Sequence, residues 1–475
     1  MKFKELERYM EKLFKILFLI EGYLQTCSFT FGKKIISFFL WPTIILGIII
    51  LIYRVIEYKR FYNDKKIIIL IFFCLSFMIS SILQRQYGMY TNIRTLGIIV
   101  LQFFILFWND AETEIEKIEK EKLNLEKIFL LGTTILTIIS FATLFMNYSK
   151  VIPSDIGPDI VFGMTWGRLF GAYWDPNIAS VICSFSIIIA LDYLIKSKNK
   201  FKKVLYIFFI IMQMFYIAFS DSRTGLLCML VASVVYAGIS LLSRNQEIDK
   251  KIILKVSTIP IFIGIVVAGS IIGTKKIYNL ILNKHQSESY SYVENETNYE
   301  ESNVIENENR KQIDRGYDVK KDISNRRFDI WKSGLEIFSH NILFGVSRAN
   351  IVPYAKDNLP ETYIVNNTHM EFWSMHNLYV DLIVSQGAIG FILFITFFIW
   401  IFVDILKNLK DIKKNITDFE KIITLIAIEF VSTLVMTEII YLETPISFIF
   451  WIEIGYLYSC IQRNKKVRKI GNGEK

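Results

Sequence analysis

The histidines of this chain are the first residues whose positions suggest chemistry. There are four, at His285, His340, His369 and His376. His376 is followed directly by an apolar run, in the segment MHNLYVDLIVSQGAIG. A neutral imidazole titrates near physiological pH, so at such a position it can serve as a general base. The alternative interpretation is an interfacial histidine that caps the following helix.

Arg223 stands at the edge of another apolar run, in the segment FSDSRTGLL. A guanidinium at the bilayer edge is costly unless it snorkels to water or pairs with an anion. One interpretation is therefore snorkelling, or an ion pair with Asp221. The other is an anion clamp that faces a cavity, because a guanidinium offers a planar fork of donors to phosphate oxygens.

Two further arginines lie between the apolar runs. Arg327 precedes Trp331 by four residues, so the two share one face of a helix. Its alternative roles are binding of lipid headgroups and pairing with Asp329. Arg168 lies in the segment TWGRLFGAYWDPN. Turn formation explains the Gly and Pro residues of that segment, but it does not explain the arginine.

Several carboxylates fall inside the apolar runs. Asp381 follows Asn377 by one helical turn, so both side chains can face the same cavity. Carboxylates at membrane depth form either a proton or ion path or hydrogen bonds between packed helices. We favour packing for Glu429 and Glu453. The set comprises Asp192, Asp381, Glu429, Glu438 and Glu453.

No metal site and no cofactor is predicted. His369, Glu371 and His376 have a suggestive order, but they lack a third ligand at helical or hairpin spacing. The five cysteines lie within or beside apolar runs and form no C-x-x-C pair. The sequence also has no Gly-rich phosphate loop or Walker motif.

Long apolar runs must position these residues. Of the 475 residues, 53% are hydrophobic, and the excess gathers in runs of about 17–25 residues, the length that crosses a bilayer core. Such runs must be helical, because no water is present to satisfy the backbone. The predicted fold is all-α, a polytopic membrane helix bundle of about twelve transmembrane helices. The predicted spans are 13–31, 35–54, 66–84, 94–108, 128–147, 177–195, 203–220, 224–243, 252–273, 377–405, 421–441 and 444–461.

Lys and Arg residues cluster between these runs, which explains the formal charge of +9 without nucleic acid. With the N-terminus in the cytoplasm, the cytoplasmic segments hold about 32 Lys and Arg, and the short outer loops hold about seven. The first span is the weakest, since it carries Lys15 and Glu21. If it lies at the interface, the count becomes eleven and the N-terminus moves outside. We expect the N-terminal run to be retained, because no small-residue cleavage pattern follows it.

This topology divides the chain into four parts. Residues 1–147 hold the N-terminal transmembrane helices, and residues 148–273 hold the central ones, with an outer loop at 148–176. Residues 274–376 form a large extracytoplasmic loop. Residues 377–475 hold the C-terminal transmembrane helices and a basic cytoplasmic tail.

The large loop has two contrasting portions. Residues 285–325 are rich in Glu, Asn, Ser and Tyr and poor in aliphatic residues, so we expect them to be flexible. Residues 326–345 predict a helix that lies along the membrane surface, because four large apolar side chains share one helical stripe. The stripe consists of Phe328, Trp331, Leu335 and Phe338.

Four segments, in this order, resemble the bacterial O-antigen ligase/polymerase family of envelope polysaccharide enzymes. They are GRLFGAYWDPNIAS at 167–180, SDSRTGLL at 220–227, RFDIWKSGLEIFSHNILFGV at 327–346 and HNLYVDLIVSQGAIG at 376–390. With the twelve-span topology, the resemblance covers most of the chain. The third segment departs from the Pro-x-x-Gly-x-Gly ending that is usual in the family: Ile342 and Ser347 stand at the positions of the Pro and the second Gly.

The resemblance implies a glycosyltransferase at the outer side of the cytoplasmic membrane. It implies transfer of a glycan from an undecaprenyl-diphosphate carrier to a glycan, lipid or protein acceptor. In this scheme Arg223 and Arg327 bind the diphosphate leaving group, His376 deprotonates the acceptor hydroxyl, and Arg168 and Asn377 are further substrate contacts. Fixed guanidinium groups in a low-dielectric site stabilise the charge that develops on the departing diphosphate. Because the donor is already activated, no nucleotide is implied.

The resemblance leaves open whether the chain is a polymerase or a ligase. A second candidate is a transporter or flippase of the lipid-linked oligosaccharide, which should show paired interrupted helices in two halves. A third is a membrane protein that only binds anionic lipid or polymer. The enzyme interpretation requires Arg223, Arg327 and His376 to converge on one outer cavity.

Overall fold

The computed structural model describes most of the chain. It covers residues 2–32, 34–57, 64–109, 113–152, 159–244, 250–293, 313, 324, 326–367, 372–409, 412, 416–435 and 439–471.

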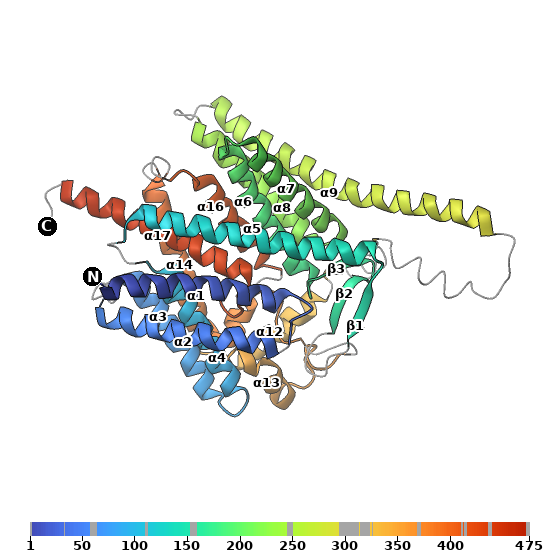
Figure 1. The fold of residues 1–475 in the computed structure, drawn as a ribbon. Coiled ribbons are helices and arrows are strands. Elements are labelled where there is room, and N and C mark those ends of the chain that lie inside the picture. Colours follow the sequence, from blue (N-terminus) through green and yellow to red (C-terminus); the bar gives the residue numbers. More distant parts are fainter. Residues whose placement is uncertain are drawn as a thin grey trace.

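Helices dominate the described residues and run side by side in one bundle (Figure 1). The first residues of α1 and the last of α17 lie on the same side of the bundle, and a small sheet lies on the opposite side. This arrangement agrees with both chain ends facing the same compartment. The helices are α1 Lys2–Thr26, α2 Lys34–Glu57, α3 Lys65–Leu83, α4 Met89–Leu101 with the π-helix η2 Gln102–Phe107, α5 Ile115–Phe145, α6 Pro176–Lys196, α7 Lys200–Phe219, α8 Arg223–Arg244, α9 Lys250–Val293, α12 Arg327–His340, the short η3 Arg348–Asn350, α13 Ile351–Asn358, α14 Leu378–Lys407, α16 Phe419–Ser432 and α17 Pro445–Gly471.

Within the described part of the chain, nine helices are long and apolar enough to cross a membrane. They are α2, α3, α4 with η2, α5, α6, α7, α8, α9 and α14. The chain is therefore a multi-pass membrane protein. The other three predicted spans coincide with α1, α16 and α17, so the count of twelve stays a prediction. Helix α16 has 14 residues, fewer than the roughly 17–25 that cross a bilayer core.

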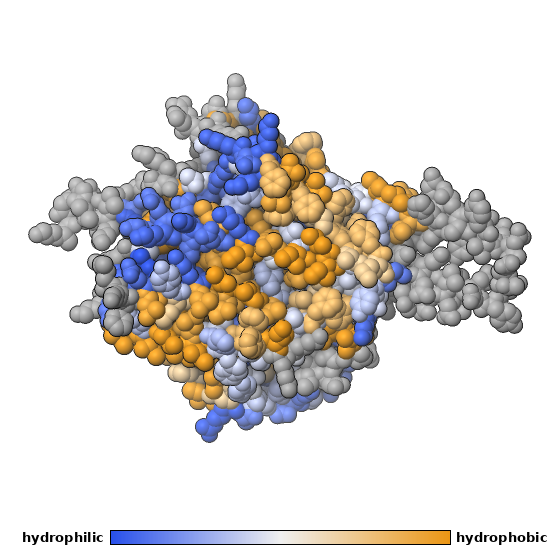
Figure 2. Space-filling view, viewed as in Figure 1, coloured by the Kyte–Doolittle hydropathy of each residue, from blue (hydrophilic) through white to orange (hydrophobic). Residues whose placement is uncertain are grey.

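The surface of the bundle is apolar where a soluble protein would be polar. Phe38 is 73% exposed, Phe201 is 76% exposed and Phe262 is 67% exposed, on three different helices. Figure 2 shows apolar side chains over the middle of one face and hydrophilic ones near the chain ends. Many Ser, Thr and charged side chains are instead buried between helices. This distribution fits a bundle whose outer surface faces lipid.

The prediction of an all-α fold missed a three-stranded antiparallel sheet in the outer loop 148–176. Its strands are β1 Ser149–Ile152, β2 Ile160–Thr165 and β3 Arg168–Gly171, in the order β1-β2-β3. At Gly163 φ is +69°, and a Cβ there would lie 1.7 Å from the carbonyl oxygen of Tyr148. Only glycine fits there. In the sequence, however, a glycine favours a turn, so the strand that contains Gly163 was not predicted.

The large loop is more ordered at both ends than expected. Helix α9 continues to Val293, beyond the predicted span end at residue 273. The predicted surface helix is confirmed as α12, but its buried face is Ile330, Ser333, Gly334 and Ile337. Phe328 and Leu335 of the apolar stripe are 68% and 51% exposed. These two residues thus face away from the protein, whereas Trp331 of the same stripe packs against it, and contact of the stripe with a membrane stays a prediction. The segment expected to be flexible, 285–325, lies largely outside the described residues.

Candidate active site

His376 lies directly before α14, in a turn that the helix itself organises. The Asn377 side chain caps α14 and accepts hydrogen bonds from Tyr379 N at 3.0 Å and Val380 N at 3.3 Å. His376 has φ +50°, a left-handed backbone conformation that is uncommon for a residue other than glycine. Its backbone N donates to Ser374 Oγ at 3.1 Å. Asn377 therefore has a structural role as the helix cap, and its predicted substrate contact stays a prediction.

Asp381 holds this turn from one helical turn below. Its carboxylate is fully buried and accepts hydrogen bonds from Ser374 Oγ and Met375 N, both at 3.0 Å. Met375 directly precedes His376, and Ser374 is two residues before it. The backbone conformation that presents the imidazole thus depends on a buried charge.

Arg348, which the sequence analysis missed, is the partner of that charge. Its Nη1 lies 3.4 Å from Asp381 Oδ1 and donates to the carbonyl oxygen of Trp373. Its guanidinium lies 5.7 Å from the centre of the Tyr441 ring. The available signal was an arginine shortly after the third family segment, but nothing in the sequence indicates its pairing with a residue 33 positions later.

Helix α12 is fixed against the same turn. Trp331 Nε1 donates to the carbonyl oxygen of Met375 at 2.9 Å. A Cβ at Gly334 would lie 2.8 Å from the sulfur of Met375, so glycine permits the close approach. This docking brings Arg327, the half-buried first residue of α12, to the histidine.

The electrostatics of His376 confirm which charges surround it. The pKa of His376 is lowered to about 4, chiefly by burial; the negative charge of Asp175 opposes this shift, and the positive charges of Arg327 and Arg348 add to it. The imidazole is therefore neutral near pH 7. Two guanidinium groups and one carboxylate from three separate segments lie close enough to act on it.

A break in α14 lies below the histidine. Gly387 has φ +63° and ψ −166° inside the helix, a region that essentially only glycine adopts. Neighbouring backbone groups bond instead to the segment after α12: Val346 N donates to Val384 O at 2.9 Å, and Ser347 N to Ser385 O at 2.8 Å. Irregular backbone at membrane depth is tolerated where protein groups satisfy it. The break explains the SQGAIG part of the fourth family segment.

Arg168 and Arg223 belong to a second wall, by which we mean β3 together with the ends of α6, α7 and α8. Arg168 is buried; its Nε donates to the carbonyl oxygen of Ser220 at 2.7 Å, and its Nη2 donates to Asn177 Oδ1 at 2.8 Å. These contacts tie β3 to the ends of α6 and α7. Arg223 is exposed at the first residue of α8. Ser222, the residue before it, donates to the same Asn177 oxygen at 3.0 Å.

Asp175 links that wall to the histidine. Its carboxylate caps α6, accepting hydrogen bonds from Asn177 N at 2.6 Å and Ile178 N at 3.1 Å. The same carboxylate acts on the pKa of His376. Asp221, a suggested partner of Arg223, forms an ion pair with Lys275 at 2.8 Å. Arg327, Arg348 and Asp175 thus lie close enough to His376 to act on it electrostatically, and Ser222 links the Arg223 segment to Asn177, while the convergence of Arg223 on the site stays a prediction.

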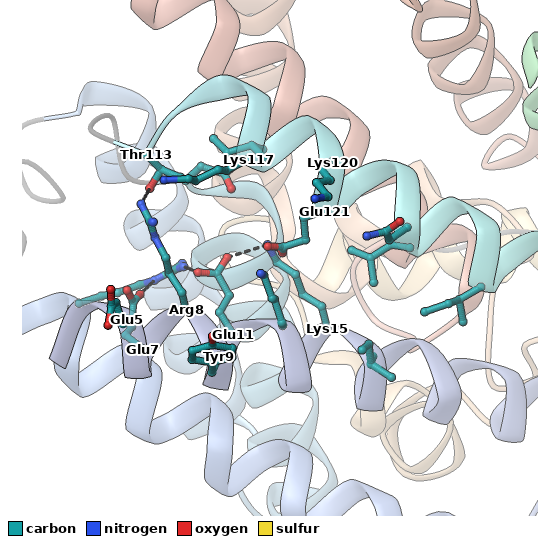
Figure 3. A pocket seen from close by; sticks show the side chains of 18 residues that line it. Glu5, Glu7, Arg8, Tyr9, Glu11, Lys15, Thr113, Lys117, Lys120 and Glu121 are labelled. Carbon is teal, nitrogen blue, oxygen red and sulfur yellow. Dashed lines mark hydrogen bonds and ion pairs between the residues drawn. The ribbon is translucent and has the colours of Figure 1, made fainter. Parts of the chain in front are cut away.

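A second polar region lies at the end of the bundle where the chain begins. A cavity of about 500 Å³ lies between α1 and α5 (Figure 3). Lys15 Nζ lies 2.6 Å from Glu11 and 2.7 Å from Glu121, and Arg54 Nη2 lies 2.7 Å from Glu11. These pairs involve part of the charge of its wall, and the cavity is lined by none of the residues discussed around His376.

One group of carboxylates has the spacing of a metal site among the described residues. Oxygens of Glu126, Asp418 and Glu453 lie within 4.8 Å of one another. The ammonium groups of Lys122 and Lys421 already lie among them, the latter 2.6 Å from Glu126 and 2.8 Å from Asp418. Two cations therefore already occupy the place that a metal ion would take. Of the residues considered for a histidine metal site, His369 and Glu371 lie outside the described residues.

Comparison with known proteins agrees with the family segments. An uncharacterised protein of Haemophilus influenzae is 26% identical over 236 residues, which are 49% of this chain and 51% of that protein. The chain thus spans about half the length of the curated relative it matches. The profile of the O-antigen ligase family matches residues 207–395, a range that contains Arg223, Arg327, Arg348 and His376. Over residues 207–395, therefore, this chain is similar to the O-antigen ligase family.

Proposed function

We propose that this protein is a membrane glycosyltransferase that moves a glycan from an undecaprenyl-diphosphate carrier to an acceptor hydroxyl. It acts at the outer face of the cytoplasmic membrane, as an O-antigen-type polymerase or ligase. The observation that carries the proposal is a neutral histidine with two guanidinium groups acting on it, at the head of a broken membrane helix. The match to the O-antigen ligase family supports the class of reaction.

The proposed step transfers one proton, forms one bond and breaks another. The acceptor oxygen attacks the anomeric carbon while its proton passes to a ring nitrogen of His376. The bond between the anomeric carbon and the diphosphate oxygen breaks, and its electron pair stays on the diphosphate. Arg327 and Arg223 bind that leaving group, and Arg348 adds positive charge near it. Preorganised guanidinium groups stabilise charge as it develops and need no reorganisation during the step.

The low pKa of His376 suits this role. A base must be deprotonated before the reaction, and burial, with a smaller contribution from the surrounding guanidinium groups, keeps the imidazole neutral. A bound diphosphate offsets their positive charge, so the imidazole becomes more basic when the donor is present. Donor binding therefore activates the base.

The test uses cells that lack the native gene and carry the wild-type chain or His376→Ala. We expect His376→Ala to lower product by about 10²–10⁴-fold, the range of general-base catalysis, at an unchanged protein level. Carrier-linked single repeat units should accumulate if the protein is a polymerase, and carrier-linked long chains if it is a ligase. Near-normal product at equal protein level would overturn the proposal.

The same cells separate the enzyme from a flippase. Loss of an enzyme leaves the accumulated carrier-linked glycan at the outer face, where periodate added to intact cells oxidises it. Loss of a flippase leaves it inside and protected. Protection of the accumulated glycan in the His376→Ala cells would favour transport.

A further inference from the structure

A second cavity lies next to the candidate active site and has no role in the step described above. It measures about 230 Å³ and lies between α1, α4, the start of α6 and the segment before α17. This is smaller than the roughly 300–1,000 Å³ of pockets that hold drug-sized ligands. Its size suits one small ring. Its polar lining includes Gln25, Thr91, Arg94 and Glu443, and its aromatic lining includes Phe31, Trp174 and Tyr441.

Two of its lining residues, Tyr441 and Trp174, connect the cavity to the candidate active site. Tyr441 places its hydroxyl 2.6 Å from Ser385 Oγ and 2.9 Å from Gln386 Nε2, beside the break in α14. The ring of Tyr441 lies beneath the Arg348 guanidinium. Trp174 directly precedes Asp175, the carboxylate that faces His376. An occupant of this cavity is therefore adjacent to the reacting groups.

The cavity contains a carboxyl group that protein groups satisfy only in part: Glu443 interacts with Glu21, Gln25 and Arg94, but one of its oxygens accepts no hydrogen bond from the described residues. Glu443 is 5% exposed, and its Oε2 has no hydrogen-bond partner among the described residues. Arg94 Nη2 lies 3.9 Å from that oxygen, and the Arg94 side chain is 40% exposed. Burial of an unpaired carboxylate oxygen is costly. A ligand hydroxyl that donates to Glu443 would remove this cost.

The charges of the cavity argue against an anionic ligand. Glu21, fully buried, lies close enough to Glu443 and Arg94 for electrostatic interaction with both. One guanidinium thus faces two carboxyl groups, so a diphosphate gains little here. A neutral ligand with both hydroxyl donors and ether or hydroxyl acceptors matches the carboxylate and the guanidinium together.

The aromatic wall is rigid, which suits a flat ring face. Trp174 Nε1 donates to the carbonyl oxygen of Gln25 at 2.9 Å, and the Trp174 ring stacks on Phe31 with centroids 4.9 Å apart. Rigid aromatic side chains supply contact area at little entropic cost. A sugar ring combines an apolar face with hydroxyl groups at its edge.

We propose that this cavity binds one uncharged sugar residue of a glycan substrate beside the reacting centre. The inference rests on the proposed function and assigns part of its substrate to named residues. The sugar belongs either to the donor, next to the diphosphate, or to the acceptor. Glu443 and Arg94 bind its hydroxyl groups, and Trp174 packs on its face.

The test compares full-length variants in cells and after purification. Glu443→Gln removes the charge with little change of shape, Arg94→Gln removes the guanidinium, and Thr95→Trp fills the cavity. Ile93→Trp is the matched control, since Ile93 is 57% exposed on the same helix and does not line the cavity. Two quantities are measured: product in cells per amount of protein, and carrier-linked glycan that co-purifies with the chain, by mass spectrometry.

We expect Glu443→Gln and Thr95→Trp to lower product about tenfold or more, as removal of a buried hydrogen bond to substrate does, and Ile93→Trp to leave it within about twofold. If the donor sugar occupies the cavity, co-purified glycan falls with the product. If the acceptor sugar does, co-purified glycan is unchanged while product falls. If Glu443→Gln or Thr95→Trp accumulates poorly, product and co-purified glycan are measured in Arg94→Gln instead, because the Arg94 side chain is 40% exposed.

Two outcomes would overturn the inference. One is that Glu443→Gln, Arg94→Gln and Thr95→Trp all leave both quantities within about twofold of wild type, well inside the effect expected for a lost hydrogen bond. The other is an equal loss in Ile93→Trp. Failure of the proposed function is separate, because it is detected by full product in His376→Ala with an intact cavity.

Discussion

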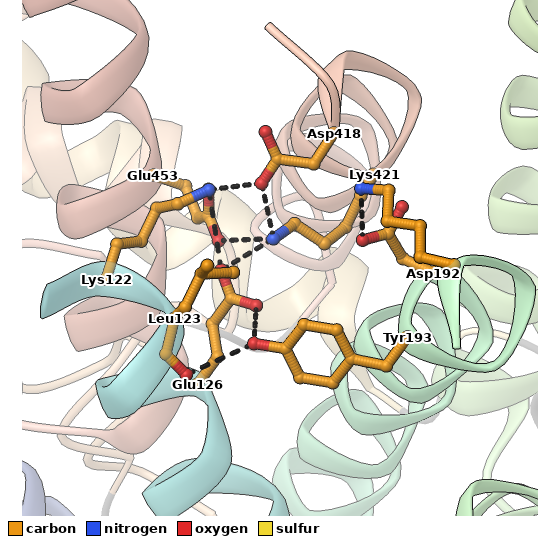
Figure 4. Close-up of polar contacts among 9 residues, drawn as sticks. Lys122, Leu123, Glu126, Asp192, Tyr193, Asp418, Lys421 and Glu453 are labelled. Atoms are coloured by element: carbon orange, nitrogen blue, oxygen red, sulfur yellow. Dashed lines mark hydrogen bonds and ion pairs between the residues drawn. The ribbon is translucent and has the colours of Figure 1, made fainter. Parts of the chain in front are cut away.

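Two clusters of charge in this protein differ in what surrounds them. In the inner cluster, Lys122 and Lys421 lie among Glu126, Asp418 and Glu453 (Figure 4). All five side chains are at most 2% exposed. In the outer cluster, the Arg348 side chain is 13% exposed, Arg327 and His376 are half-buried and Arg223 is exposed.

The two clusters also differ in how their charges are matched. Each lysine of the inner cluster contacts all three carboxylates, and Tyr193 Oη donates to Glu126 at 2.7 Å. The cluster fastens α5, α16 and α17 and is closed to ligands. In the outer cluster, positive charge acts on an imidazole that stays accessible. A closed network of charges stabilises packing, whereas an open one is available to an anionic substrate.

The largest effect should come from breaking the inner cluster. Lys421→Met leaves three buried carboxylates with one ammonium, and removal of one partner from a buried network costs about 3–5 kcal/mol. We expect little folded protein in the membrane and a lower Tm in detergent. Lys117→Met is the control: Lys117 and Glu114 are 56% and 67% exposed and pair at 2.9 Å, so its loss should cost at most about 1 kcal/mol. Equal Tm values for the two variants would contradict the comparison.

In the outer cluster, geometry should matter more than charge. Arg223→Lys keeps the charge but loses the planar fork, so we expect product to fall about 10- to 100-fold at an unchanged protein level. Arg85→Lys, at another exposed arginine, should have no effect. Full activity of Arg223→Lys would favour a snorkelling role, since snorkelling requires only the charge.

Asp381 should have an intermediate effect, because it acts through the turn that holds His376. Asp381→Asn keeps the shape but weakens the contacts to Arg348 and to the turn, and we expect about a tenfold loss of product. The acid limb of the pH–activity profile of Asp381→Asn should also move, and a purely structural defect would not move it. Asp329→Asn, at an exposed position on α12, is the control and should change neither quantity.

The pH dependence should report the charges around His376. Because the base must be neutral, activity is retained as pH falls and is lost on approach to the lowered pKa of about 4. The profile of kcat/KM reports the free enzyme. Arg348→Gln removes a positive charge, so its acid limb should move to higher pH. Asp175→Asn keeps the helix cap and removes a negative charge, so its limb should move lower. A shift in the same direction for both would exclude this electrostatic account.

The smallest effect should come from single cysteines that test the topology. Ser339→Cys on α12 and Asn199→Cys between α6 and α7 are exposed positions and should leave activity unchanged. The five natural cysteines are all buried, so background labelling is low. An impermeant maleimide added to intact cells should label residue 339 and not residue 199. The opposite result would reverse the predicted orientation.

The residues proposed for catalysis illustrate how far the sequence reaches. Arg327 and His376 were predicted from their segments, and the structure brings them together. Arg348 was missed because its importance comes from Asp381 and Tyr441, which are 33 and 93 positions away in the chain. Arg168 was noted as unexplained, and the structure shows it tying three segments together.

The sequence by itself determined the membrane character, most of the helices and the similarity to the O-antigen ligase family, because hydropathy and short segments are local properties. Tertiary structure alone decided the sheet, whose Gly163 reads as a turn residue, and the break at Gly387, whose backbone is satisfied by a segment some 40 residues earlier. It also decided which charged side chains are buried among partners and which stay accessible to a ligand. Exposure and pairing depend on contacts between distant segments, and no local pattern encodes those contacts.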